Sequence, residues 1–305
     1  MIARVLGTVL LVPGLAVSSS CHAGHLAPSA NTSLPPGSRE ILLHAGDLEL
    51  SAIEWTGSGT PIVLLHGLGG NAATWAGLVQ QLPGRHVIAI DLPGHGKSPL
   101  PPNWDIAPMA RDIAAAVRAR WPGAHIWGGH SWGGKLAVAA AATDSDGTRG
   151  LILVDAVPAG PYRIGDPAGV VEFLFAGELD LWPNLDSALA SARHLPQFTP
   201  WTPEVALAFR RAVVVQPGGR VMPLLSRDKG IAILQSLATD LTATVARIRA
   251  PVLVLSAPHS SFEQAQRALF PAAHFVSLAG NHWLQISNVE GVRRAVLEWL
   301  GSERL

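Results

Sequence analysis

The stretch Gly128-Gly129-His130-Ser131-Trp132-Gly133-Gly134 decides how the rest of the chain is interpreted. It follows an apolar run ending at His125-Ile126-Trp127, which is typical of a buried strand. It precedes an alanine-rich segment, Lys135 to Ala142, with high helix propensity. A serine between glycines at such a corner is the pattern that presents a hydroxyl at the tip of a sharp strand-to-helix turn.

The two glycines that flank the serine favour this interpretation. A Cβ atom at Gly129 or Gly133 would strike the neighbouring strand or helix. Ser131 would then lie in the first turn of a helix, where free N–H groups and the helix dipole stabilise a developing negative charge. A glycine-rich turn that only packs tightly is the alternative for this motif by itself.

Composition limits the class of protein. The chain has 305 residues, 48% of them hydrophobic and 14% charged, which predicts a globular protein with a substantial core in one large or two small domains. Its formal net charge is zero and it has no basic run, so we expect no nucleic-acid partner. No histidine pair has the spacing of a helical zinc site, and we expect neither a metal nor a cofactor.

The N-terminus has the layout of a secretory signal. One positive charge lies in Met1 to Arg4, an apolar run follows from Val5 to Val17, and small residues occupy Ser18 to Ala23. This predicts a signal peptide over residues 1–23 and a secreted, periplasmic or cell-envelope protein. A disordered or buried extension is the alternative.

Cys21 is the single cysteine, so no internal disulfide is possible. It lies where a lipidated cysteine would follow a bacterial lipoprotein signal, which makes it a possible lipid anchor. However, Ser18-Ser19-Ser20 lacks the leucine usually found three residues earlier, and simple cleavage after Ala23 competes. Residues 24–38 are rich in Ser, Pro and Gly and predict a flexible tether.

Beyond the tether, apolar runs alternate with helical patterns, and no stretch resembles a membrane span. This alternation predicts an α/β fold with a mostly parallel sheet covered on both faces, formed by residues 39–157 and 250–305. The expected strands are Leu48–Trp55, Pro61–Leu65, His86–Ile90, the run before Ser131, Leu151–Val154, Val252–Leu255 and His274–Leu278. The expected helices are Ala72–Leu82, Met109–Arg120, the one after Ser131, and segments around Phe262–Phe270 and Val289–Leu300.

Residues 158–249 interrupt this rhythm with a long, mostly helical insertion. An insertion at the carboxyl edge of a parallel sheet would lie over the crevice where ligands bind, so we interpret it as a cap. Aromatic residues are scattered through it and either line a substrate pocket or form the cap's own small core. They are Phe173, Phe175, Trp182, Phe198 and Trp201.

Four motifs together resemble those of the α/β-hydrolase superfamily. They are His66-Gly67-Leu68-Gly69-Gly70, Asp91-Leu92-Pro93-Gly94-His95-Gly96-Lys97-Ser98, the stretch around Ser131, and Gly280-Asn281-His282-Trp283. The resemblance covers roughly residues 40–157 and 250–300 and leaves the cap outside. It implies a Ser–acid–His triad in that chain order and an oxyanion hole built from two separate loops.

On this resemblance Ser131 is the nucleophile and His282 is the base that removes its proton. His66 and His95 lie in the loop motifs and are expected to be structural. The side chain of His130, inside the turn, is expected to point away from Ser131.

The acid is where the chain departs from the family pattern. The loop that usually carries it reads Ser256-Ala257-Pro258-His259-Ser260-Ser261, with serine where aspartate is expected. The superfamily has a second solution, as in haloalkane dehalogenases, with the acid at the end of the strand that follows the nucleophile's helix. Asp155 ends that strand here and is the preferred candidate, with Glu263 or another group as alternatives.

The resemblance also implies that the backbone N–H groups of Leu68 and Trp132 form the oxyanion hole. A serine that attacked an alkyl halide or an epoxide would leave an ether without a carbonyl for water to attack, so Ser131 indicates acyl transfer. Hydrolysis of a carboxylic ester of a small or medium apolar substrate is therefore the expected reaction. Thioesters, lactones, amides, C–C bonds next to a ketone, and lyase or perhydrolase chemistry remain open. So does a ligand-binding, receptor-like protein with a weakened triad.

Overall fold

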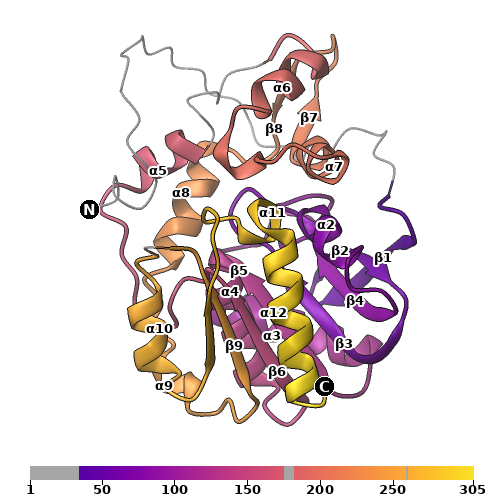
Figure 1. Cartoon of the computed structure of the whole chain (residues 1–305). Helices are drawn as coiled ribbons and strands as arrows, with labels where there is room; N and C mark the ends of the chain where they lie inside the picture. Colours follow the sequence, from indigo (N-terminus) through magenta and orange to yellow (C-terminus); the bar gives the residue numbers. More distant parts are fainter. Residues whose placement is uncertain (1–33, 175–181, 259) are drawn as a thin grey trace.

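An eight-stranded sheet forms the centre of the protein (Figure 1). The computed structural model describes residues 34–174, 182–258 and 260–305. The strands lie in the order β1-β2-β4-β3-β5-β6-β9-β10, with β1 and β2 antiparallel at one edge and all pairs from β4 to β10 parallel. Their bounds are β1 Ser38–Ala45, β2 Leu48–Trp55, β3 Ser58–Leu65, β4 Arg85–Ile90, β5 His125–His130, β6 Thr148–Val154, β9 Val252–Ser256 and β10 His274–Ser277. The predicted α/β fold with a mostly parallel sheet is confirmed.

Helices cover both faces of the sheet. Successive residues of a strand point to opposite faces, and in the central strands both sets of side chains are apolar and buried. In β3, Val63 and Leu65 belong to one buried cluster, and Ile62 and Leu64 belong to the other. Helices α3 (Ile106–Arg120), α4 (Ser131–Thr143) and α9 (Thr242–Val245) contribute to the first cluster, which α10 (Glu263–Leu269) also contacts. The short elements η1 (Ala72–Trp75), α2 (Ala76–Val79) and α11 (Leu284–Ser287) pack with α12 (Val289–Ser302) on the second.

Three details differ from the expected elements. The segment expected as one helix over Ala72–Leu82 is a 3-10 turn, capped by Asn71, followed by a single α turn that ends at Val79. Strand β1 was not predicted, because its only apolar run is the short Ile41-Leu42-Leu43 and polar residues flank it on both sides. The predicted tether, residues 24–38, extends one residue into β1.

The segment between β6 and β9 lies over the carboxyl edge of the sheet (Figure 1). Its described elements are α5 Pro167–Leu174, α6 Leu185–Ala192, η2 Pro196–Phe198, α7 Pro203–Arg211, β7 Val213–Val215, β8 Val221–Pro223, α8 Arg227–Ser236 and α9, which packs on the first cluster. The β7–β8 hairpin was not expected in a segment interpreted as helical; its turn contains Gly218 and Gly219, both with positive φ. We refer to residues 158–249 as the cap.

The cap has a small core of its own. Phe209, Val213 and Val221 are buried in it, and Trp182, Phe198 and Trp201 pack against it. Phe175 and the side chain of Phe173 lie outside the described residues.

Two buried cations fasten the cap to the core. Lys135 of α4 is fully buried, and its ammonium group donates hydrogen bonds to the carbonyls of Gly160 (2.8 Å) and Leu237 (2.7 Å), one near each end of the cap. Arg211, at the end of α7, is also fully buried and binds the carboxylate of Asp91 at 2.7 Å and that of Glu40 at 3.2 Å. Asp91 follows β4 and Glu40 lies in β1, so this pair of contacts ties α7 to the sheet.

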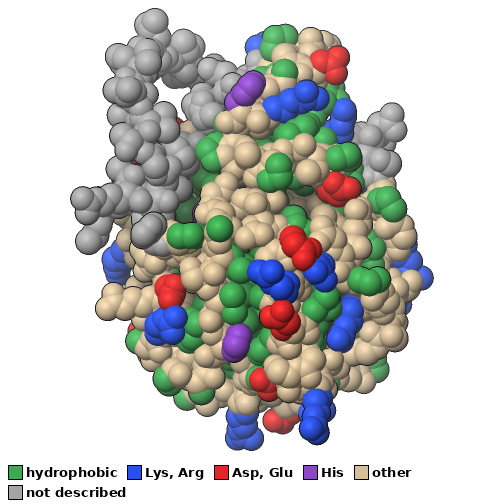
Figure 2. Space-filling model, in the orientation of Figure 1, with side chains coloured by type: hydrophobic (Ala, Val, Ile, Leu, Met, Phe, Trp, Pro, Cys, Tyr) green, Lys and Arg blue, Asp and Glu red, His purple; other side chains and the backbone are tan. Residues whose placement is uncertain are grey.

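The predicted signal peptide, Cys21 and the tether up to residue 33 lie outside the described residues and stay predictions. No helix in the described part of the chain has the length and apolar character needed to cross a bilayer. On the face shown in Figure 2, acidic and basic side chains are interspersed and do not gather into a patch of one sign.

Candidate active site

The strand-to-helix corner predicted at Ser131 is present. β5 ends at His130, α4 begins at Ser131, and Ser131 has the positive φ of 53° that a sharp turn imposes on a residue with a side chain. A Cβ atom on Gly129 would lie 2.3 Å from the carbonyl oxygen of Gly133. One on Gly133 would lie 2.2 Å from the carbonyl oxygen of His66. Glycine is therefore required at both positions for the corner to close, as the sequence indicated.

Two backbone N–H groups near Ser131 have no acceptor. Those of Leu68 and Trp132 donate to no other group within the described part of the chain. Trp132 is in the first turn of α4, where N–H groups lack partners inside the helix. Leu68 lies in the loop after β3, the strand paired with β5. These are the two donors that the sequence assigned to an oxyanion hole.

His282 and Asp155 form a close pair. The Asp155 Oδ2 atom lies 2.6 Å from His282 Nδ1, and its Oδ1 accepts a hydrogen bond from the N–H of Ala257 at 3.2 Å. Asp155 directly follows β6, is buried and has a φ of 37°, whereas His282 lies in the loop after β10. Because Nδ1 faces the carboxylate, Nε2 is the ring nitrogen left for proton transfer.

The other candidate acid is engaged elsewhere. The carboxylate of Glu263 accepts a hydrogen bond from the hydroxyl of Ser256 at 2.6 Å and binds Arg267 at 2.7 Å. These partners lower the pKa of Glu263, with the Ser256 hydrogen bond as the first cause. The structure therefore brings Asp155, and not Glu263, to His282.

Ser131 and His282 line the same cavity, which contains about 780 Å³ of space including its open mouth. No hydrogen bond joins the two side chains among the described residues. Catalytic hydrogen bonds are often long in ligand-free structures and tighten when substrate binds. Apart from His130 and His282, the lining is mainly apolar and includes Val170, Tyr162 and Phe262.

His130 contacts the loop that carries His282, a role that sequence reasoning missed. Its Nε2 donates to the carbonyl of His282 at 2.9 Å, and the two rings lie 4.7 Å apart. Burial, followed by the proximity of His282, holds the pKa of His130 well below its usual value. A neutral His130 therefore links the residue before Ser131 to the backbone of His282. The only feature of the sequence that could have indicated this contact was the position of His130 next to Ser131.

Two further buried histidines hold the Leu68 loop. His66 Nε2 accepts from the N–H of Leu92 at 3.0 Å, and His95 Nε2 accepts from the N–H of Gly69 at 3.3 Å. Each Nδ1 lies near a carbonyl oxygen, which fixes the neutral tautomer. Burial lowers the pKa of His66 to about 4 and that of His95 to about 3. Their structural role agrees with the expectation from sequence.

No group of histidine, cysteine or carboxylate side chains in the described ranges could hold a metal ion. The arrangement consists of a serine at a helix N-terminus, a histidine paired with a carboxylate, and two free N–H groups.

Comparison with known proteins places these observations in a family. A family model described as the alpha/beta hydrolase fold matches residues 60–289. An esterase of Mycobacterium tuberculosis is 35% identical over 155 residues, which is 48% of this chain and 51% of the relative. A pimeloyl-[acyl-carrier protein] methyl ester esterase of Methylococcus capsulatus is 36% identical over 107 residues, which is 35% of this chain and 41% of the relative. The chain thus spans about half the length of these curated relatives.

The fold is also found among solved structures. The structure of E-2-(acetamidomethylene)succinate hydrolase superposes with a TM-score of 0.72 and 24% identity, covering 87% of this chain and 99% of that protein. At this identity the similarity establishes the arrangement of the elements and leaves the substrate open.

Proposed function

The chain belongs to the alpha/beta hydrolase fold family, and from that premise we propose that it is a serine hydrolase that cleaves carboxylic esters through an acyl-enzyme on Ser131. The observation that carries the proposal is the 2.6 Å contact between His282 and Asp155 beside the cavity that Ser131 lines. The esterases among the similar proteins support ester cleavage as the type of reaction.

The proposed reaction begins with attack of Ser131 Oγ on the ester carbonyl carbon, while His282 Nε2 takes the hydroxyl proton. The carbonyl oxygen becomes an oxyanion, which the N–H groups of Leu68 and Trp132 stabilise. His282 then gives its proton to the departing alkoxide and leaves an acyl ester on Ser131. Water, activated by His282 in the same way, hydrolyses that ester and restores the enzyme.

Asp155 has two tasks in this scheme. It holds His282 in the tautomer that carries its proton on Nδ1, and it stabilises the imidazolium that forms during each proton transfer. The ligand-binding alternative was motivated by the missing acid after β9. The position of Asp155 beside His282 supports the enzyme over this alternative, because a carboxylate is available to the histidine from another loop.

Substitutions of the three side chains test the proposal. With 4-nitrophenyl butyrate, we expect Ser131→Ala and His282→Ala to lower kcat by on the order of 10⁴-fold or more, because the nucleophile or its base is lost. Asp155→Asn should lower kcat by roughly 10⁴-fold, since an amide selects the wrong tautomer. Labelling of Ser131 by a fluorophosphonate, followed by mass spectrometry, identifies the nucleophile directly.

Glu263→Gln is the matched control for Asp155→Asn, because both changes convert a carboxylate near the end of the sheet into an amide. We expect Glu263→Gln to retain most of the activity. Full activity in Ser131→Ala would overturn the proposal, and a severe loss in Glu263→Gln with little in Asp155→Asn would overturn the choice of acid.

A further inference from the structure

Lys135 is a buried cation in α4, the helix that begins at Ser131. It lies about one turn after Ser131, and its side chain is fully buried. Burial lowers the pKa of Lys135 to about 8, and the charge of Asp240 acts against that shift, so the amine is mostly protonated at neutral pH. Burying a charge costs free energy that an apolar side chain of similar length would not cost. Stability alone therefore does not explain why a cation occupies this position.

The ammonium of Lys135 joins two segments of the cap that are far apart in the sequence. It donates to the carbonyl of Gly160 at 2.8 Å and to that of Leu237 at 2.7 Å. The N–H of Tyr162 also donates to the Leu237 carbonyl, at 2.9 Å, so the two segments are bound to each other as well. Leu237 is the C-cap of α8, where free carbonyls and the negative end of the helix dipole stabilise a cation. Lys135 thus fixes both segments relative to α4.

The same two segments form part of the cavity that Ser131 lines. Tyr162, Leu234 and Leu237 belong to its lining, and we call these three residues the cap wall. The ring of Tyr162 packs edge-on against that of Phe262, another lining residue, with 5.2 Å between the ring centroids. Because Leu237 is both a residue of the cap wall and a partner of the ammonium, the ammonium fixes the distance between the cap wall and the start of α4.

We propose that Lys135 is a positioning residue that sets the selectivity for acyl chain length by holding the cap wall close to Ser131, an inference that rests on the proposed function. The acyl group remains bonded to Ser131 in the acyl-enzyme and therefore lies in the cavity that the cap wall lines. Without the ammonium, the carbonyl of Gly160 loses its donor and the cap wall can move away from α4. Short acyl groups then lose contacts, and longer ones gain room. Asp155 and His282 follow core strands, so the groups that transfer the proton are not displaced.

Lys135→Met tests the proposal, because methionine has a similar length and no donor. We expect the ratio of kcat/KM for 4-nitrophenyl butyrate over 4-nitrophenyl octanoate to fall roughly 10-fold, the discrimination typical of one methylene group in an apolar pocket. The change should appear mainly in KM, since the reacting groups stay in place. An unchanged ratio would overturn the proposal. So would a change confined to a series of alkyl butyrates, because the cap wall would then contact the alcohol.

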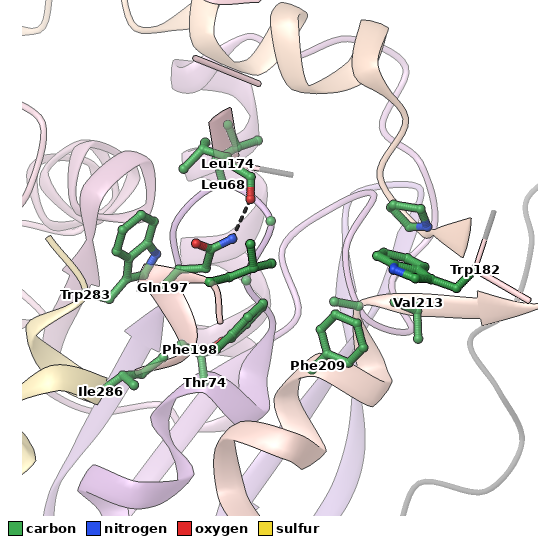
Figure 3. A pocket seen from close by; sticks show the side chains of 15 residues that line it. Leu68, Thr74, Leu174, Trp182, Gln197, Phe198, Phe209, Val213, Trp283 and Ile286 are labelled. Atoms are coloured by element: carbon green, nitrogen blue, oxygen red, sulfur yellow. Dashed lines mark hydrogen bonds between the residues drawn. The ribbon is translucent and has the colours of Figure 1, made fainter. Parts of the chain in front are cut away.

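Arg211→Met is the matched control, because Arg211 is the other buried cation that binds the cap to the core. Its helix, α7, carries Phe209, which lines a neighbouring cavity (Figure 3). No described residue of α7 lines the cavity of Ser131. Arg211→Met should therefore loosen the cap and leave the butyrate-to-octanoate ratio unchanged. An equal fall of the ratio in both variants would show that selectivity follows general loosening of the cap and would overturn the role of Lys135.

Two further variants separate the donor from the fold. Lys135→Gln retains N–H donors without the charge and should keep more of the preference for butyrate than Lys135→Met does. Leu237→Ala shortens a side chain of the cap wall and leaves the carbonyl that Lys135 binds. It should lower the ratio by itself, and combined with Lys135→Met it should lower the ratio by less than the product of the two single effects, because both act on the same wall. Fully multiplicative effects would overturn the link between Lys135 and the cap wall.

Hydrogen exchange tests the position of the cap wall without any substrate. The amide of Tyr162 should exchange roughly 10-fold faster in Lys135→Met than in the wild type, because the carbonyl that accepts from it is no longer held by the ammonium. Faster exchange with unchanged selectivity would make Lys135 purely structural and overturn the inference. If Ser131→Ala hydrolysed the esters as fast as the wild type, the proposed function would fail, whereas the exchange result would still show whether Lys135 holds the cap wall.

Discussion

The corner at Ser131 and helix α7 of the cap are both buried at the carboxyl edge of the sheet, but different forces hold them there. At the corner the backbone itself is close-packed: Gly133 lies against the carbonyl oxygens of His66 and Leu65, and no side chain intervenes. Helix α7 is held by side chains, with Arg211 bound to Asp91 and Phe209 buried in the cap core. The corner therefore tolerates no added atom, whereas the contacts of Arg211 with Asp91 and Glu40 can be removed by a single substitution in α7.

The cavity that Ser131 lines combines the two regions. Ser131 and His282 follow strands of the core, whereas Tyr162, Val170 and Leu234 come from the cap. We therefore expect substitutions in the cap to change the shape of this cavity without disturbing the sheet.

The largest expected effect is at the corner. Gly133→Ala places a Cβ atom 2.2 Å from the carbonyl oxygen of His66, and only a backbone shift can relieve that contact. We expect the free energy of unfolding to fall by more than about 4 kcal/mol, with loss of ester hydrolysis. Denaturant unfolding and activity measure the two effects.

Gly123→Ala is the control for that substitution, because a Cβ atom there would meet nothing within 4 Å. Its stability should change by less than about 1 kcal/mol. If both glycine variants were equally stable, the backbone packing described for the corner would be wrong.

Removing the charge of Arg211 from α7 should lower the free energy of unfolding less than Gly133→Ala does. Arg211→Met leaves the buried Asp91 carboxylate without its cation, although the N–H groups of Ala72 and Lys97 still donate to it. We expect a loss of about 3 kcal/mol in the free energy of unfolding, at the lower end for a broken buried ion pair. Faster hydrogen exchange confined to the cap would locate the loss in α7.

A surface pair provides the comparison for Arg211. Arg293 and Glu290 of α12 lie 2.5 Å apart, with Glu290 63% exposed. Arg293→Met should change the free energy of unfolding far less than Arg211→Met does, because water and salt screen an exposed pair. Equal losses in the two variants would show that burial does not increase the contribution of Arg211 to the free energy of unfolding.

The smallest effect is the response of the Leu68 loop to acid. The pKa of His66 is lowered to about 4 and that of His95 to about 3, so below pH 6.5 the unfolded chain binds protons that the folded chain does not. Stability should therefore decrease as the pH falls from 6.5 toward 4. At pH 5.5 the loss is about 1.4 kcal/mol for each histidine.

Unfolding in denaturant at pH 7.5 and pH 5.5 measures the combined loss, to which His125 and His130 also contribute because burial lowers their pKa values. His95→Gln cannot titrate, so the difference between the two pH values should shrink by about half of the contribution from His66 and His95. The carboxyl groups whose pKa values are lowered titrate below this window and do not contribute to it. Identical stability at the two pH values would contradict the neutral, buried state of both histidines.

Much of the core could be predicted because its signals are local. A continuous apolar run predicts a strand buried on both faces, and the glycines around Ser131 mark a corner that only they can form. Strand β1 was missed because its half-exposed pattern resembles a loop. The β7–β8 hairpin was missed because each strand has three residues, too few for a periodic pattern.

The side chains that connect the cap to the core could not be predicted. Lys135 lies in an alanine-rich helix, and Arg211 lies at the end of an amphipathic helix. Both positions are typical of exposed charged residues. Their partners are far away in the sequence: Arg211 and Asp91 are 120 positions apart.

The sequence by itself determined the class of fold, the order of the strands along the chain, and the corner that presents Ser131, because periodicity and glycine sterics act over a few residues. The tertiary structure decided which carboxylate meets His282 and how the cap is attached to the core. Those outcomes depend on the distance between groups that are remote along the chain, and only the completed packing sets that distance.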